Sequence, residues 1–246
     1  MADACRLVVA TYNVHSCVGT DGRHDCERIA EVIRSLDADV VALQEVESLL
    51  EAHEGPTQLS RLVRASGFPR GVAGPMFHER RAPFGNAVLT RWPVHAVRRV
   101  DLSVPGREPR GALDLDLAAA GVGVRVVATH FGLRSPERAE QWRRLFAHCR
   151  DATSPMVVLG DFNHWWWRDR LLHAVERRLG PTPALPTFPS RRPVLALDRI
   201  WLHPRSALVS LEVVASALAR LASDHLPLRA EIALPENGCD GAHDLR

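Results

Sequence analysis

The chain has 246 residues, 46% of them hydrophobic and 24% charged, and its formal net charge is +2. This length allows one large hydrophobic core, and the composition is typical of a globular protein. A charge so close to neutral excludes a global field that would drive the chain onto nucleic acid or an anionic membrane. No apolar run is long enough to form a transmembrane anchor, and the amino terminus lacks the pattern of a secretory signal.

Five cysteines are scattered along the chain, an odd number without a Cys-x-x-Cys motif. They predict free thiols in a reducing compartment, and hence a cytoplasmic protein. His15, Cys17, His24 and Cys26 place four zinc-binding residue types within twelve residues. Their spacing matches no compact zinc motif, so we expect loop residues there. All 31 basic residues are arginine, so any phosphate contact would come from a planar guanidinium.

In the first third of the chain, the hydrophobic pattern predicts strands that alternate with helices. An apolar, β-branched run over 6–14 is the first strand, and a buried strand over 39–46 is the second. A helix over 25–36 lies between them, with Asp25 as its amino-terminal cap. A short amphipathic helix over 56–66 follows, with a proline in its first turn.

The middle of the chain predicts paired strands and a charged helix. Residues 84–91 and 94–102 form apolar runs separated by Trp92-Pro93. Residues 111–117 alternate apolar and polar side chains, the pattern of a strand with one solvated face, and residues 121–129 are the expected partner. A helix rich in charge pairs is predicted over 136–149.

The last third begins with a buried strand over 156–160 and contains one helix, a proline-rich loop and further strands. These are a helix over 168–178, the loop 181–193, and strands over 195–202, 207–215 and 226–232. Strands that occur both in pairs and between helices predict α/β layers with mixed sheets. No composition break marks a linker, so we expect one domain over 1–234 and a polar tail over 235–246.

Polar residues follow or interrupt the apolar β runs at seven places. Such residues are costly to bury unless they are paired, and so many are better explained by convergence on one site than by isolated core polar groups. Gly160-Asp161-Phe162-Asn163 could by itself be a turn, although strand alternation would put its Asp and Asn on one side. The seven places are Asn13, Glu45, His130, Asp161, Asn163, Asp198 and Asp224-His225.

These side chains indicate metal-assisted hydrolysis. Glu45, helped by Asp224 or Asn13, supplies the hard oxygen ligands that suit Mg²⁺ or Mn²⁺. An aspartate that orients or deprotonates water beside such a cation can drive hydrolysis. A histidine paired with a carboxylate would be held as a cation near a phosphate, and Asn and His donors would stabilise charge on its oxygens. The predicted reaction class is phosphoester hydrolysis.

The ordered set of motifs resembles the endonuclease/exonuclease/phosphatase superfamily, which includes deoxyribonuclease I, abasic-site endonucleases, neutral sphingomyelinases and inositol polyphosphate 5-phosphatases. The resemblance implies a four-layer α/β/β/α sandwich, with two mixed β-sheets packed face to face and helices outside. It covers residues 12 to 225 in the family's order. The motifs are Tyr12-Asn13, Leu43-Gln44-Glu45, Gly85-Asn86-Ala87-Val88-Leu89-Thr90-Arg91, Thr129-His130, Gly160-Asp161-Phe162-Asn163, Asp198-Arg199-Ile200 and Ser223-Asp224-His225.

The resemblance also implies roles for the residues at the matching positions. Glu45 would be the principal Mg²⁺ ligand, with Asn13 and Asp224 near the same ion. Asp161 would orient or activate the attacking water. Asn163 would contact the scissile phosphate.

The same resemblance bears on the remaining candidates. His225 would contact or protonate phosphate oxygens and be held by Asp198, and His130 matches a second histidine whose usual acidic partner is not identifiable. Arg110 lies where some members contact phosphate, with a solvated arginine as the alternative. Asn86 would be either a substrate-binding residue or a structural hydrogen-bonding residue, and we favour the structural role.

The substrate is less defined. Glu47, beside the metal ligand, disfavours a polyanionic duplex, and Trp165–Trp167 could stack on bases, anchor at a lipid surface or pack in the core. We expect a monomeric, divalent-metal-dependent phosphodiesterase, and a nuclease acting on DNA ahead of an enzyme for phospholipid, sphingomyelin-type or small-molecule phosphoesters. An inactive binding module should have lost Glu45, Asp161 or His225, all of which are present. An exposed apolar rim would favour a lipid substrate, and an arginine-lined groove would favour DNA.

Overall fold

The structure, a computed structural model, describes residues 6–47, 56–77, 84–149, 155–165 and 170–234. Its first sheet has six strands in the order β10-β11-β1-β2-β4-β3. Only the β1–β2 pair is parallel, so the sheet is mixed. The strands are β1 (Arg6–Asn13), β2 (Val40–Glu47), β3 (Arg70–Phe77), β4 (Phe84–Thr90), β10 (Leu208–Val213) and β11 (Leu228–Ala233).

The second sheet has five strands in the order β5-β6-β7-β8-β9. It is also mixed, because β7 and β8 run parallel and the other neighbours antiparallel. Of the strands predicted in the middle region, 94–102, 111–117 and 121–129 are its β5, β6 and β7, whereas 84–91 is β4 of the first sheet. The strands are β5 (Val94–Asp101), β6 (Gly111–Ala119), β7 (Val122–His130), β8 (Met156–Asp161) and β9 (Asp198–His203).

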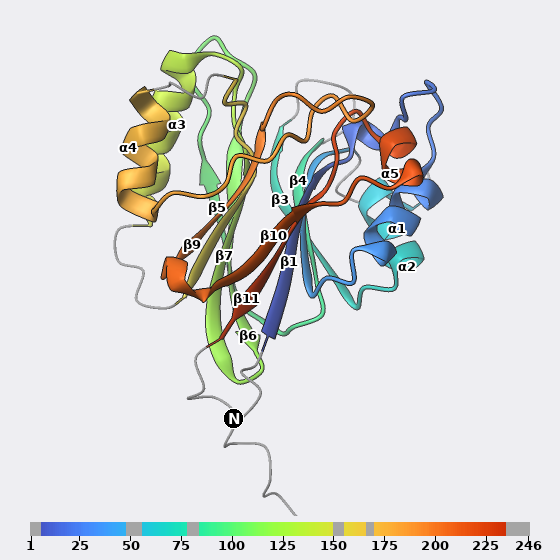
Figure 1. Cartoon of the computed structure of the whole chain (residues 1–246), viewed down its shortest axis with the longest axis horizontal. Coiled ribbons are helices and arrows are strands. Elements are labelled where there is room, and N and C mark those ends of the chain that lie inside the picture. Colours follow the sequence, from blue (N-terminus) through green and yellow to red (C-terminus); the bar gives the residue numbers. More distant parts are fainter. Residues whose placement is uncertain (1–5, 48–55, 78–83, 150–154, 166–169, 235–246) are drawn as a thin grey trace, which may run out of the picture.

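The two sheets pack face to face, and helices cover both outer faces (Figure 1). On the first sheet lie α1 (Cys26–Ser35), α2 (Gln58–Ser66) and the short α5 (Ala217–Ala222). On the second lie α3 (Ser135–His148) and α4 (Arg170–Leu179). The predicted α/β/β/α sandwich is confirmed. Among the described residues, no helix is both long and apolar enough to cross a membrane.

Strand alternation divides the core into three layers. In β1, Leu7 and Val9 point into the layer between the sheets, whereas Ala10 and Tyr12 pack beneath α1. Both faces of each central strand are therefore buried, which is why these strands appear as unbroken apolar runs in the sequence. Burial of each aliphatic side chain contributes about 1.5–3 kcal/mol to the free energy of unfolding. Burial on both faces therefore makes the strand ends rigid supports for a site.

The elements follow the predicted order with two additions. The strand β3 was not predicted, because Gly71, Gly74 and Pro75 interrupt its apolar pattern. The six-residue α5 is too short to show a helical period. Asp25 caps α1 as expected, since its side chain accepts a hydrogen bond from the backbone N–H of Arg28 at 3.0 Å. The predicted tail over 235–246 lies outside the described residues.

Candidate active site

Three strands of the second sheet carry polar residues at the same edge of the sheet, where the register places them side by side. His130 is aligned with Asp161 in the β7–β8 ladder, and Asp161 is aligned with Asp198 in the β8–β9 ladder. Leu159 and Ile200, each two residues from the acid on its strand, pack in the layer between the sheets. Since side chains alternate along a strand, the three polar residues also face the first sheet.

The end of β8 is held by a glycine and by an aromatic cluster. Gly160 has φ 150°, and a Cβ there would lie 1.9 Å from the carbonyl oxygen of Thr129, so the close approach of β7 and β8 requires glycine. Phe162 points to the opposite face, where its ring stacks on Trp142 with centroids 5.0 Å apart. The buried ring fixes the rotation of the chain and leaves Asp161 directed toward the first sheet.

A β-bulge places Glu45 at the end of β2. The register with β4 shifts between Leu43 and Val46, and Glu45 has φ 56°. Because of the extra residue, Val46 packs beneath the helices like Leu43, while Glu45 lines the cleft. A non-glycine residue with positive φ costs about 1–3 kcal/mol, and such strain concentrates at functional sites.

Asn13, at the end of β1, connects the two sheets. Its Nδ2 donates to Oε1 of Glu45 at 2.9 Å and to Oδ2 of Asp161 at 3.2 Å. Its Oδ1 accepts a hydrogen bond from the backbone N–H of His15 at 3.0 Å, which fixes the orientation of the amide. One buried amide thus holds two carboxylates from different sheets at a common site.

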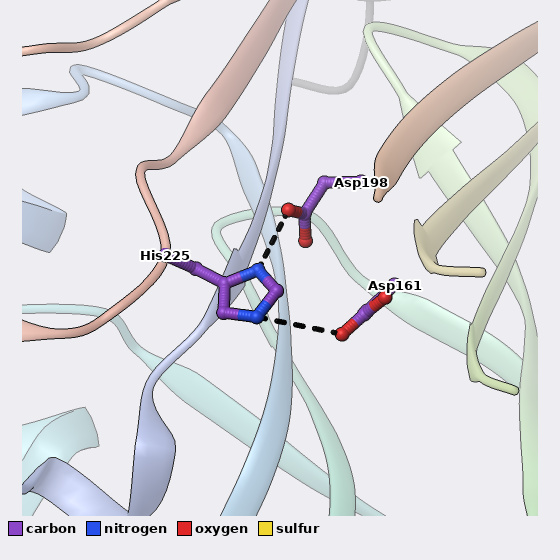
Figure 2. Close-up of side chains that lie close together, drawn as sticks. All are labelled: Asp161, Asp198 and His225. Carbon is purple, nitrogen blue, oxygen red and sulfur yellow. Dashed lines mark hydrogen bonds and ion pairs between the residues drawn. The ribbon is translucent and has the colours of Figure 1, made fainter. Parts of the chain in front are cut away.

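His225 lies in the loop before β11, between Asp198 and Asp161 (Figure 2). Its Nδ1 donates to Oδ2 of Asp198 at 2.8 Å, and its Nε2 lies 3.8 Å from Oδ2 of Asp161. Burial alone would lower the pKa of His225, but the carboxylates of Asp198, Asp161 and Asp224 outweigh it and raise that pKa to about 10. His225 is therefore an imidazolium at neutral pH.

Asp161 lies at the centre of the site. Its Oδ1 accepts a hydrogen bond from the backbone N–H of Asn163 at 3.0 Å. Burial, and after it the negative charge of Asp198, raise the pKa of Asp161 to about 6, although the charge of His225 works in the opposite direction. Asp161 is therefore a carboxylate at neutral pH, and a more basic one than an exposed aspartate.

His130 approaches Asp161 from the other side but has a different partner. Its Nε2 lies 3.6 Å from Oδ2 of Asp161, and its Nδ1 lies 3.3 Å from Nη1 of Arg110. Burial, Arg110 and His225 all lower the pKa of His130 well below the ordinary histidine value. The sequence offered no acidic partner for His130, and the residue in that place is an arginine. Arg110 is itself paired with Glu108 at 2.8 Å.

These side chains surround a cleft of about 610 Å³. Seven of the predicted residues line it, and Asp198 is buried beneath His225. The seven are Glu45, Arg110, His130, Asp161, Asn163, Trp165 and His225.

Two of the remaining candidates lie apart from this lining. Asp224 has its Oδ1 3.8 Å from Nδ1 of His15, at the margin of the site. Asn86 is buried and does not line the cleft; its Nδ2 donates to the carbonyl oxygen of Gly111 at 2.9 Å. This bond joins β4 to β6 and is consistent with the structural role that we favoured for Asn86 over substrate binding. Trp166 and Trp167 lie outside the described residues.

The sequence did not point to several residues that line the cleft. Leu133 (60% exposed), Phe188 and Leu197 are apolar side chains on its wall, beside the predicted Trp165 (44% exposed). Glu108, two residues before Arg110, also lines the cleft and was not singled out from the sequence. These residues lie in loops, where no periodic pattern marks the side that faces a site.

Within the described chain, one group of at least three His, Cys, Asp or Glu residues is compact enough for a metal ion: Asp161, Asp198 and His225. A protonated histidine cannot be a ligand, and His225 already bonds to Asp198, so this group is better explained as an ion-pair network. The candidate zinc residues over 15–26 form no such group; His15 and Cys17 instead begin and end a 3₁₀ turn. The carboxylate of Glu45, bonded by Asn13 on one oxygen, fits a hard cation better.

Residues 10–225 match the Endonuclease/Exonuclease/phosphatase family, so the chain belongs to that family. It is 31% identical to the Escherichia coli (strain K12) protein named "Uncharacterized protein YbhP", over 92% of this chain and 96% of that protein.

Solved structures share the fold. The endonuclease/exonuclease/phosphatase from Beutenbergia cavernae DSM 12333 superposes with a TM-score of 0.77 at 27% identity, covering 94% of this chain and 72% of that chain. A humanized D. rerio TDP2 superposes with a TM-score of 0.70 at 18% identity, covering 93% and 99%. At that identity the second comparison establishes the fold and no more.

Proposed function

We propose that this protein is a phosphodiesterase that uses a bound divalent cation, Mg²⁺ or Mn²⁺, to hydrolyse phosphoester bonds. The observation that carries the proposal is the meeting of both sheets at Asn13, whose amide bonds to Glu45 and Asp161. Beside this meeting point lies the His225–Asp198 ion pair. Glu45 as a metal ligand, Asp161 as a base and His225 as a fixed imidazolium are the groups that phosphoester hydrolysis needs. Membership of the family supports their acting together.

Glu45 would hold the cation, with the amide oxygen of Asn13 and the carboxylate of Asp224 as further oxygen donors. A bound cation would polarise a phosphoryl oxygen and offset the negative charge of the phosphate, which repels the attacking water. The bulge at Glu45 supports this role, because it turns the carboxylate into the cleft at a cost in backbone energy.

Asp161 would orient the attacking water and accept its proton. A carboxylate with a pKa near 6 is ionised at neutral pH and is more basic than an ordinary aspartate. Both of its oxygens are held, by the backbone of Asn163 and by Asn13, so its orientation is fixed before substrate binds.

His225, kept as an imidazolium by Asp198, would donate to a phosphoryl oxygen and stabilise the charge that develops at phosphorus. Asn163 would contact the same phosphate. Arg110 would act more weakly on it, since its guanidinium is already engaged by Glu108 and His130.

From the sequence we expected DNA as the substrate ahead of lipid or small phosphoesters. The residues that line the cleft favour a substrate other than DNA. Among the described residues that line it, Arg110 is the single arginine, whereas Glu47 and Glu108 add negative charge at its wall. A polynucleotide site needs several cations along the backbone path, which this wall does not supply. The exposed Leu133 and Trp165 instead form an apolar rim that suits a phosphodiester with an apolar substituent, such as a phospholipid.

One parallel assay tests both the class and the substrate. Plasmid DNA, single-stranded DNA, RNA, abasic duplex, phospholipid vesicles and bis-p-nitrophenyl phosphate are incubated with Mg²⁺, with an Asp161→Ala variant as the control. We expect turnover of phospholipid and of bis-p-nitrophenyl phosphate above that of the nucleic acids. Cleavage of DNA alone would reject the apolar substrate and retain the nuclease, and no hydrolysis of any phosphoester would reject the proposed class.

A Leu133→Ser, Trp165→Ser variant sharpens the substrate test. It should raise the KM for phospholipid while leaving turnover of bis-p-nitrophenyl phosphate within about threefold, because hydrolysis itself would not use the rim. An unchanged KM for phospholipid would show that the rim does not bind substrate.

A further inference from the structure

Glu108, Arg110 and His130 form a connected group at the wall of the cleft. We infer that Glu108 and Arg110 hold His130 as a neutral ring with its proton on Nε2, so that Glu108 is a positioning residue and His130 a fixed hydrogen-bond donor rather than a proton-supplying acid. The catalytic part of this inference rests on the proposed function, whereas the position of the proton does not.

The geometry at Nδ1 decides where the proton lies. Nη1 of Arg110 lies 3.3 Å from Nδ1 of His130, and both side chains are buried, at 8% and 5% exposure. A guanidinium has donors and no acceptor, so Nδ1 must accept and carries no proton. A protonated Nδ1 would put two buried donors against each other, one of them charged, and would leave both without an acceptor.

Glu108 holds the guanidinium in this position. Its Oε2 accepts from Nη2 of Arg110 at 2.8 Å, while Nη1 is directed at His130. Arg110 directly precedes β6, whose Ala112 pairs with Thr129 of β7, the residue before His130. The backbone register and the Glu108 carboxylate therefore define where the guanidinium lies.

The opposite nitrogen of the ring faces the centre of the site. With Nδ1 accepting, Nε2 carries the proton, and the acceptor beside it is Oδ2 of Asp161 at 3.6 Å. Nδ2 of Asn163 lies at 3.3 Å from the same nitrogen but donates to the carbonyl oxygen of Phe131 at 2.9 Å, which fixes that amide as a donor. Arg110 is charged and is therefore a stronger hydrogen-bond donor than the amide of Asn163. The arginine thus determines that Nδ1 is the accepting nitrogen of the ring.

The charges around the ring oppose a second proton. Burial penalises a charged ring, and the cations Arg110 and His225 repel one. The carboxylate of Asp161, 3.6 Å away, acts in the opposite direction but does not offset them. A neutral imidazole can donate its Nε2–H to Asp161 or to a phosphoryl oxygen, but it cannot give that proton up without becoming an anion. His130 would thus stabilise charge, and protonation of the leaving group would fall to another donor.

The position of the proton can be measured by ¹⁵N NMR of the histidine rings, with the His130 signals assigned from a His130→Gln variant. We expect an unprotonated Nδ1 and a protonated Nε2 throughout the range from about pH 6 to 8, which spans the ordinary histidine pKa. In an Arg110→Met variant, the ring should become a mixture of tautomers and take up a second proton at higher pH than in the wild type. An Nδ1–H tautomer or an imidazolium in the wild type would overturn the inference.

Glu108 is tested by Glu108→Gln, with Arg107→Met as the control, because Arg107 is an exposed arginine in the same loop. Glu108→Gln should broaden or shift the His130 ring signals and lower kcat on bis-p-nitrophenyl phosphate about tenfold, the loss expected from weakening a hydrogen bond to a charged group. Arg107→Met should change neither. Ring signals and kcat equal to the wild type in Glu108→Gln would reject the positioning role. If no phosphoester is hydrolysed, the proposed function fails while the ring signals still test the tautomer.

Discussion

Two buried histidines flank one carboxylate in this site, and they differ in the residue that lies behind each ring. His225 and His130 each approach Oδ2 of Asp161 through Nε2, at 3.8 and 3.6 Å. His225 has Asp198 behind it and a pKa raised to about 10, whereas His130 has Arg110 behind it and a pKa well below the ordinary value. Burial acts in the same direction on both rings, so the partner on the far nitrogen determines the charge.

The difference gives the site one fixed cation and one neutral donor around a single base. A cation on both sides would pull the pKa of Asp161 down and weaken it as a base, whereas two neutral rings would leave the charge on a phosphate uncompensated. The pKa of about 6 at Asp161 reflects burial and Asp198 opposed by a single imidazolium.

The largest effect is expected when the shared carboxylate is removed. Asp161→Asn keeps the size of the side chain but removes the base between the two histidines, so kcat on bis-p-nitrophenyl phosphate should fall by about 10²–10⁴-fold. Circular dichroism should show an unchanged fold. A turnover within a few-fold of the wild type would remove Asp161 from the mechanism.

Asp198→Asn is expected to make His225 resemble His130. The pKa of His225 should fall from about 10, because its hydrogen-bonded counter-charge is lost, and kcat near pH 8 should fall by about 10²-fold as the imidazolium is depleted. NMR titration measures the pKa directly. An unchanged titration would reject the Asp198–His225 pairing.

The same variant has a defined effect on stability. A histidine whose folded-state pKa is raised contributes stability below its unfolded pKa of about 6.5, and this contribution is lost as pH rises through about 10. Asp198→Asn should therefore lower the melting temperature most at about pH 6, and the difference from the wild type should shrink toward pH 10. A difference that grows with pH would contradict this assignment.

A smaller effect is expected at the neutral ring. His130→Gln retains an N–H donor, so kcat should fall only about tenfold. The pH profile of the wild type should fall below about pH 6, as Asp161 is protonated, and above about pH 10, as His225 loses its proton. An alkaline limb near pH 7 that disappears in His130→Gln would show that His130 supplies a proton after all.

The smallest effect concerns a residue behind Asp198. Thr187 is buried, and its hydroxyl donates to Oδ2 of Asp198, the oxygen that also binds His225. Thr187→Val should shift the pKa of His225 slightly and lower kcat by a few-fold, since one neutral hydrogen bond contributes about 1 kcal/mol. Thr182→Val is the matched control, because Thr182 binds the backbone of Ile200 instead. Equal kcat values in the two variants would show that Thr187 does not support His225.

Much of the fold could be predicted from hydrophobic pattern, because both faces of the central strands are buried. The ends of those strands could also be predicted, since Asp161 directly follows an apolar run and Asp198 interrupts one. The strand β3 was missed because glycines and a proline replace the apolar alternation, and pairing with β4 determines it instead.

The partners within the site could not be predicted in the same way. His130 and Arg110 meet because β6 pairs with β7 in one particular register, and nothing in the residues between them encodes that register locally. The orientation of Glu45 depends on a bulge that a run of apolar residues does not reveal. Asn86 could not be distinguished from a site residue until its bond to Gly111 was seen.

The central claim is that this cleft hydrolyses a phosphoester with a cation held by Glu45, and metal dependence tests it most directly. The measurement is the rate of bis-p-nitrophenyl phosphate hydrolysis by the wild type and by Glu45→Gln across a titration of Mg²⁺. We predict no turnover of the wild type in EDTA, full recovery with excess Mg²⁺, and a much higher Mg²⁺ requirement in Glu45→Gln. Full turnover of the wild type in EDTA would contradict the account.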